Sequence, residues 1–156
     1  RGRYKKNRMN NKSDSNLKLL AINDDDLKVL SAHLQDSVTL VRDMVFLKKN
    51  RTFLMMANRF MWEDIEKGVF RKNKRIRCAV KFENVFEVRS KNINQKRPNK
   101  ILELLSIENK LKNNKHRLIL TFSGSNEVAL IVEEIQVLLD DIGLPWEVKR
   151  IPKHKL

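Results

Sequence analysis

The sequence has little cysteine, glycine and proline, and each scarcity excludes a class of protein. One cysteine, Cys78, allows no internal disulfide, so the chain is not a disulfide-stapled scaffold. Four glycines and three prolines among 156 residues exclude collagen-like and low-complexity chains. There is no glycine-rich phosphate loop and no Cys/His metal spacing, so we expect no cofactor and no metal.

Long apolar segments are also missing. No apolar run approaches the roughly 18 residues needed to cross a bilayer, which predicts no membrane span. The basic N-terminal segment is not followed by an apolar stretch, as a secretory signal would be. Together with the lone cysteine, this predicts a cytoplasmic protein in a reducing compartment.

The net charge of +14 is concentrated at the two ends. Residues 1–12 hold six Lys or Arg, residues 149–155 hold four, and neither segment holds an acid. The body between them has 23 basic and 19 acidic residues, about +4. We predict a disordered basic tail at 1–15, a single globular domain at 16–148 and a basic tail at 149–156. The native start is open, because Met9 is an alternative initiator that would leave residues 1–8 outside the protein.

Hydrophobic periodicity predicts one helix followed by short strands. Leu27, Leu30 and Leu34 recur at helical spacing behind the capping run Asn23–Asp26, which places a helix at about 23–36. Apolar and polar residues alternate over 75–82, as in a half-buried strand. Other strands are expected at 38–48, 52–60, 85–90, 101–108 and 117–122.

The last apolar segment fits two structures. Its apolar residues over 128–142 form one helical stripe, yet the first five residues also alternate as in a strand. We predict a strand at 127–132 and a helix at 133–142, while a helix over 127–132 stays open. Gly143 would end that helix. The expected fold is α+β: a mainly antiparallel small barrel or bent sandwich of about seven strands. It would be pleckstrin-homology-like, with an N-terminal helix and a C-terminal capping helix.

The stretch Asn58–Glu63 joins an amide, a guanidinium, an indole and a carboxylate directly after an apolar strand. As a binding site, Arg59 would hold an anionic group and Trp62 would stack on the ligand. As a structural plug, Trp62 would close the barrel end and Arg59 would pair with a carboxylate. Polar ends of neighbouring elements extend this candidate binding cluster, whose members are Gln35, Asp36, Asn58, Arg59, Trp62, Glu63 and Arg89.

Two charged segments have simpler interpretations. A basic patch lacks the interleaved exposed aromatics of single-strand binders, so we interpret it as a solvated face; it comprises Arg71, Lys72, Lys74, Arg75 and Arg77. The pair Asp140-Asp141 is interpreted as a solvated face of the last helix. No nucleophile–base pair is evident, so no catalytic residue is predicted.

Several spaced motifs resemble a known family. They are Asp26-Leu27, Ser31-Ala32, Gln35-Asp36, Asn58-Arg59-Phe60 with Trp62-Glu63, Val88-Arg89-Ser90 with Ile93, Leu104-Leu105-Ser106-Ile107, and Gly143 with Pro145-Trp146. From about Leu17 to His154 the chain is similar to the alphaproteobacterial domain of unknown function (DUF) 2948 family. The resemblance implies a cytosolic bacterial protein with no assigned activity, and it transfers no catalytic residue.

The function predicted from these observations is a non-catalytic binding or adaptor module, with an unknown protein or a small anionic ligand as its partner. The alternative is a basic accessory protein that binds RNA or the ribosome, or weakly binds nucleic acid, through its tails and basic loops. An unrecognised small enzyme is the second alternative.

Overall fold

The computed structural model describes residues 16–63 and 74–147. This part of the chain forms ten β-strands, one α-helix and two short 3₁₀ turns, η3 (Val41–Asp43) and η4 (Lys48–Asn50). In chain order the other elements are β1 (Lys18–Ala21), α1 (Asp24–Leu34), β2 (Val38–Leu40), β3 (Met44–Leu47), β4 (Thr52–Phe60), β5 (Lys74–Phe82), β6 (Val85–Lys91), β7 (Ile101–Lys112), β8 (Lys115–Phe122), β9 (Asn126–Val132) and β10 (Val137–Glu147).

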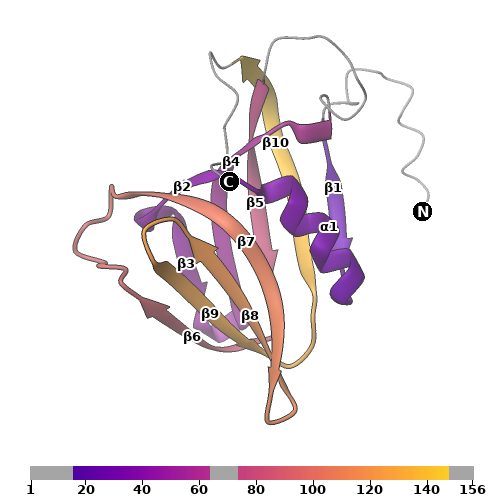
Figure 1. Ribbon diagram of the computed structural model, residues 1–156, viewed down its shortest axis with the longest axis vertical. Coiled ribbons are helices and arrows are strands. Elements are labelled where there is room, and N and C mark those ends of the chain that lie inside the picture. The colour runs from indigo at the N-terminus through magenta and orange to yellow at the C-terminus, as the bar shows by residue number, and fades with distance from the viewer. Residues whose placement is uncertain (1–15, 64–73, 148–156) are drawn as a thin grey trace.

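All ten strands belong to one antiparallel sheet that bends back on itself (Figure 1). Its order is β1-β10-β5-β4-β2-β7-β8-β9-β6, with β3 beside β4. The short strand β2 is the bend, because Val38 pairs with Asn58 of β4 on one side and with Glu103 of β7 on the other. One half of the sheet, β7-β8-β9-β6, therefore faces the other half.

The core lies between these two halves. Inward rows such as Phe53, Met55 and Ala57 on β4 meet the inward rows of β8 and β9. Cys78 belongs to such a row on β5 and is fully buried, as its alternation with apolar neighbours predicted. Helix α1 lies beside β7 and β1 and adds Leu27, Leu30 and Leu34 to the core.

The first helix confirms its sequence signals. Asn23 is the N-cap, and its side-chain oxygen accepts a 2.8 Å hydrogen bond from the Asp26 amide. Asp26 in turn accepts a 3.1 Å hydrogen bond from the Ile22 amide, so the carboxylate and the cap support each other. The acids of the first turn also suit the positive end of the helix dipole.

Turns in this sheet use residues that tolerate positive φ. Asn113 and Asn114 both adopt left-handed conformations between β7 and β8, with φ of 55° and 63°. Strand β7 runs on to Lys112, beyond the end of the strand expected at 101–108. The strand expected at 38–48 is likewise divided, by η3, into β2 and β3.

The expected pleckstrin-homology-like barrel with two terminal helices is wrong. The described residues hold ten strands rather than seven and one short helix, and they include β1, which the sequence pattern did not predict. Strand β9 confirms the strand predicted at 127–132, but the helix predicted at 133–142 is strand β10. Gly143 has a φ of +77°, as a helix-ending glycine would, yet it lies at a register irregularity inside β10.

Candidate functional site

Arg59 occupies a core-facing position near the end of β4. It continues the inward row of Phe53, Met55 and Ala57, and its side chain is completely buried. Its neighbour on β5 is Ile76, and one strand further lies Asp141 on β10. Strands are spaced about 4.8 Å apart, so the side chain must span roughly 10 Å from β4 to β10. A long, planar guanidinium suits that reach.

All five N–H donors of Arg59 are used by protein oxygens. Nε and Nη2 donate to the two carboxylate oxygens of Asp141 at 2.8 Å each. Nη1 and Nη2 donate to the two oxygens of Glu63 at 2.9 and 2.8 Å, and Nη1 also reaches the carbonyl of Phe60 at 3.3 Å. Two bidentate pairs on one guanidinium leave no donor for an external anion in this conformation.

The charges in this cluster stabilise one another. Burial alone would lower the pKa of Arg59, but hydrogen bonds to Asp141 and Glu63 raise it above its ordinary value. Burial would raise the pKa of Glu63, but His33 and Arg59 lower it to about 2. Nδ1 of His33 lies 3.7 Å from Oε1 of Glu63, an ion-pair distance rather than a hydrogen bond. Glu63 is therefore held ionised beside a permanent cation.

The cluster also fixes the start of the described chain. The Leu17 amide donates to Oδ2 of Asp141 at 2.6 Å, and the Asp141 amide donates back to the Leu17 carbonyl at 3.0 Å. One buried carboxylate thereby connects β10, β4 and the residue that precedes β1. Arg59 is thus paired with carboxylates, which the structural alternative had expected.

A second set of polar contacts surrounds the same end of the sheet. The Trp62 indole donates to the Gln35 carbonyl at 3.0 Å and packs edge-on against Phe60 at 4.6 Å. Arg75 donates to the carbonyls of Asp36 and Asn58 at 3.3 and 3.1 Å. Burial lowers the pKa of Arg75, against the raising influence of nearby carboxylates. These contacts join the end of α1 to β4 and β5.

The structure thus brings together six of the seven residues of the candidate binding cluster. Arg89 lies elsewhere: it is exposed on β6 and pairs with Glu87 at 2.6 Å. In the basic patch, Arg71 and Lys72 lie outside the described residues. Arg75 is an internal hydrogen-bond donor, whereas Arg77 is partly exposed on β5, 3.7 Å from Asp43.

Sequence reasoning missed Asp141, the main partner of Arg59. It was assigned to a solvated face because Asp140-Asp141 was read with helical spacing. The available signal was the alternation of Val137, Leu139 and Asp141, all of which face inward on β10. Recognising it required accepting a carboxylate in a core row, which is rare unless a cation is paired with it.

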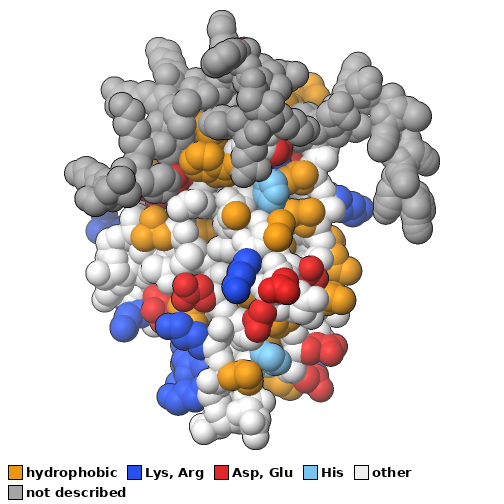
Figure 2. Space-filling view, turned by 45° about the vertical axis from the view of Figure 1, so that its right-hand side comes forward, with side chains coloured by type: hydrophobic (Ala, Val, Ile, Leu, Met, Phe, Trp, Pro, Cys, Tyr) orange, Lys and Arg blue, Asp and Glu red, His pale blue; other side chains and the backbone are white. Residues whose placement is uncertain are grey.

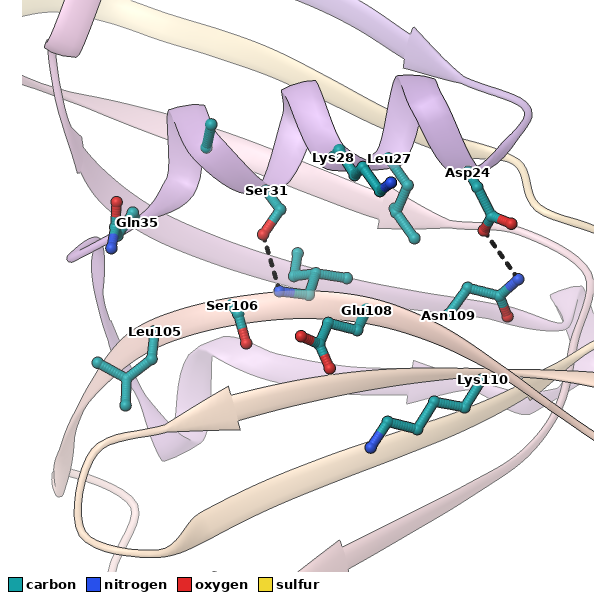
Figure 3. Close-up of a pocket in the computed structure, with 12 residues that line it drawn as sticks. Asp24, Leu27, Lys28, Ser31, Gln35, Leu105, Ser106, Glu108, Asn109 and Lys110 are labelled. Carbon is teal, nitrogen blue, oxygen red and sulfur yellow. Dashed lines mark hydrogen bonds between the residues drawn. The ribbon is translucent and has the colours of Figure 1, made fainter.

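A groove runs between α1 and β7, next to the Trp62–Gln35 contact (Figure 3). Its volume is about 620 Å³. One stripe of α1 forms one wall, and consecutive residues of β7 form the other; the lining comprises Asp24, Leu27, Lys28, Ser31, Ala32, Gln35, Leu105, Ser106, Ile107, Glu108, Asn109 and Lys110. Gln35 is the member of the candidate binding cluster that lines this groove.

One edge of β7 is open along this groove. Strand β2 pairs with β7 only as far as Glu103, and no other described strand pairs with that edge. There the Ile107 amide donates to the Ser31 hydroxyl at 2.9 Å. Alternate residues of a strand direct their main-chain groups to the same side, so those of Asn109 and Leu111 also point toward this edge.

The groove is electrostatically mixed. Asp24 and Glu108 are opposed by Lys28 and Lys110, and Asp24 accepts a 3.0 Å hydrogen bond from the Asn109 amide group (Figure 3). Figure 2 shows acidic and basic side chains together across the face that carries α1. Within residues 16–63 and 74–147, no three His, Cys, Asp or Glu side chains are grouped as metal ligands. The groove therefore offers main-chain groups and balanced charges.

Comparison with protein families gives one match. The model of the family described as "Protein of unknown function (DUF2948)" matches residues 17–154. The chain belongs to this family, as its motifs predicted. No curated protein and no solved structure matches the chain. No helix in the described part of the chain is long and apolar enough to span a membrane.

Proposed function

We propose that this member of the DUF2948 family is a non-catalytic binding module. Its site is the groove between α1 and β7, and its ligand is an extended peptide segment of a partner protein. The peptide adds a strand to the open edge of β7, a recognition mode in which main-chain hydrogen bonds supply affinity. The observation that carries the proposal is the edge of β7 beyond Glu103, which has no partner among the described strands and is lined by α1 over residues 105–110.

The dimensions of the groove suit a short peptide. Helix α1 has 11 residues and is therefore about 16 Å long. A strand of five residues covers about the same length. The cavity volume of about 620 Å³ lies in the ordinary range for binding pockets. We therefore expect a ligand segment of about five residues.

The main-chain groups available to the peptide are those near Asn109 and Leu111. The Ser31 hydroxyl covers the Ile107 amide and so blocks one position of the edge. Exposed edges favour pairing with other chains, and proteins usually cover or interrupt them. The edge of β7 is covered at Ile107 and open near Asn109 and Leu111, so a peptide strand can be added only at a limited part of the edge.

A peptide selection tests the proposal. A displayed library of random 12-residue peptides is selected on the full chain, and an enriched peptide is measured by fluorescence anisotropy. We expect Ala32→Trp, which places a bulky ring on the groove stripe of α1, to lower affinity at least tenfold. The matched control is Val29→Trp, because Val29 is an exposed position of α1 outside the groove lining. It should bind as the wild type does.

Methylation of the peptide backbone provides a second test of strand addition. Methylating alternate peptide nitrogens should abolish binding for one alternation and spare it for the other, because only one set faces β7. Strand addition in the groove would be rejected if Ala32→Trp and Val29→Trp lowered peptide affinity equally. It would also be rejected if methylating the peptide nitrogens left the affinity unchanged. Salt-sensitive RNA binding that is unchanged in Ala32→Trp, with no enriched peptide, would support the nucleic-acid alternative instead.

A further inference from the structure

A second cavity opens on the other side of the molecule, where the sheet does not close. Among the described strands, β3 pairs only with β4 and β6 pairs only with β9, so the free edges of β3 and β6 have no hydrogen bonds between them. The cavity between them has a volume of about 620 Å³. Residues from η3 and the segment after β6 complete its rim.

The floor of this cavity is continuous with the hydrophobic core. Phe53 and Val128 line it and are core residues, 4% and 3% exposed. Met44, Phe46 and Val88 also line it and pack against the core while remaining partly exposed. When an aliphatic group displaces water from these apolar walls, the free energy falls, because apolar surface is removed from water.

The rim carries a single formal charge. Arg42 is the one charged residue of the lining, beside the neutral polar Ser90 and Gln95. The Arg42 amide donates to the Pro98 carbonyl at 2.9 Å, which fixes its backbone at the rim. Its guanidinium makes no hydrogen bond or ion pair with any described residue. An apolar floor under one cation that has no ion-pair partner in the described part of the chain is complementary to a molecule with an apolar body and one negative group.

We infer that this cavity binds a free, single-chain aliphatic carboxylate of the medium-chain fatty-acid class. The chain lies on Phe53 and Val128, and the carboxylate meets Arg42, whose planar guanidinium matches it with two parallel hydrogen bonds. This site is separate from the peptide groove and shares no lining residue with it. Failure of either proposal leaves the other intact.

Titration calorimetry with octanoate, decanoate and dodecanoate, each below its micelle concentration, tests the apolar floor. Each added methylene should raise the affinity about three- to fourfold until the cavity is filled. Decanoate should bind more tightly than decanol, which has the same chain without the charge. A flat series, or equal affinity for decanoate and decanol, would overturn the inference.

Substitutions locate the site. Arg42→Gln should weaken decanoate at least tenfold and leave decanol unchanged, whereas Arg89→Gln, an exposed charge on β6 outside the lining, should change neither. Equal weakening by both variants would show a general charge effect and reject the site. Val88→Phe should fill the cavity and lower affinity for both ligands. Because Val88 is half-buried, the exposed rim substitution Gln95→Trp serves as a second filling variant if Val88→Phe does not fold.

Vesicles test whether the cavity binds a free carboxylate or a lipid in a bilayer. We expect the protein to stay in solution when neutral phosphatidylcholine vesicles are sedimented and to bind decanoate in their absence. If the wild-type protein sedimented with the vesicles and Arg42→Gln did not, the cavity would be a site for a bilayer surface. That result would overturn the inference of a free ligand.

Discussion

Replacing Arg59 with methionine should destabilise the fold strongly. Methionine keeps most of the side-chain volume but removes the guanidinium, so Asp141 is left fully buried with the Leu17 amide as its remaining donor. Breaking a buried ion pair from one side typically costs about 3 to 5 kcal/mol. That is a large part of the roughly 5 to 15 kcal/mol that stabilises an ordinary domain.

The measurement is urea unfolding followed by tryptophan fluorescence. A loss of this size corresponds to a fall in melting temperature on the order of 10 °C for a chain of this length. Arg77→Met is the matched control, because Arg77 is 41% exposed and lies 3.7 Å from Asp43. Such a surface pair contributes about 0 to 1 kcal/mol.

A compensating variant separates the lost charge pairing from lost packing. Combining Arg59→Met with Asp141→Leu and Glu63→Gln removes the stranded carboxylates, and we expect it to recover much of the stability. If Arg59→Met cost no more than Arg77→Met, the cluster would not be a structural plug, and Arg59 would return as a candidate ligand-binding residue.

Four further predictions follow from other contacts. Because the pKa of Glu63 is lowered from 4.5 to about 2, its ion pairing stabilises the fold fully above pH 4.5, and this stabilisation is lost as the pH falls toward 2. The difference in unfolding free energy between wild type and Glu63→Gln, up to about 3 kcal/mol, should therefore narrow between pH 4.5 and 2 in acid-unfolding curves. Cys78→Ser should cost about 1 to 3 kcal/mol because the site is fully buried, and native Cys78, whose pKa burial raises to about 12, should react slowly with iodoacetamide; rapid labelling would contradict the burial. Deleting residues 1–15 should change stability by less than about 0.5 kcal/mol, whereas deleting residues 1–18 should lower it clearly, because the Leu17 contacts to Asp141 are lost; a similar effect of both deletions in thermal melts would refute this. Gly143→Ala should cost about 1 to 2 kcal/mol through its φ of +77° alone, since an added Cβ would meet no atom within 4 Å; an unchanged urea midpoint would show that β10 relaxes there.

Local sequence signals predicted the elements whose stabilising contacts are themselves local. The cap of α1 involves Asn23 and Asp26, three residues apart, and the strand at 75–82 shows its buried face by simple alternation. The strand predicted at 127–132 was recovered for the same reason. In each case the residues that decide the structure are neighbours in the sequence.

The C-terminal helix was mispredicted because a distant contact decides that segment. Residues 137–141 carry apolar side chains at spacings that fit both a helix and a strand. The strand is selected by pairing with β5 and β1 and by Arg59, which lies 82 residues away from Asp141. No pattern within the segment contains that information.

The candidate site also has one part that depends on local sequence and one part that depends on distant contacts. The sequence predicted, as one alternative, that Arg59 pairs with a carboxylate, and Glu63, four residues further on, is one of its two partners. The groove cannot be predicted from local sequence, because it forms where α1 packs beside the later strand β7. The open edge of β7 depends on where β2 ends. Composition and motif spacing do not encode where one strand ends beside another.

The strand order has a consequence for how the chain is made. Strand β10 lies between β1 and β5, so the first described strand has no hydrogen-bonded neighbour until the last one has left the ribosome. After residue 59 is synthesised and before residue 141 is, Arg59 lacks its partner Asp141, and one half of the sheet lacks the strand next to its edge. Pairing of β10 with β1 and β5 must therefore wait for the last described strand, as in other folds that depend on long-range contacts. Until residue 137 is synthesised, the edge of β5 that β10 covers in the folded protein has no partner strand among the described residues.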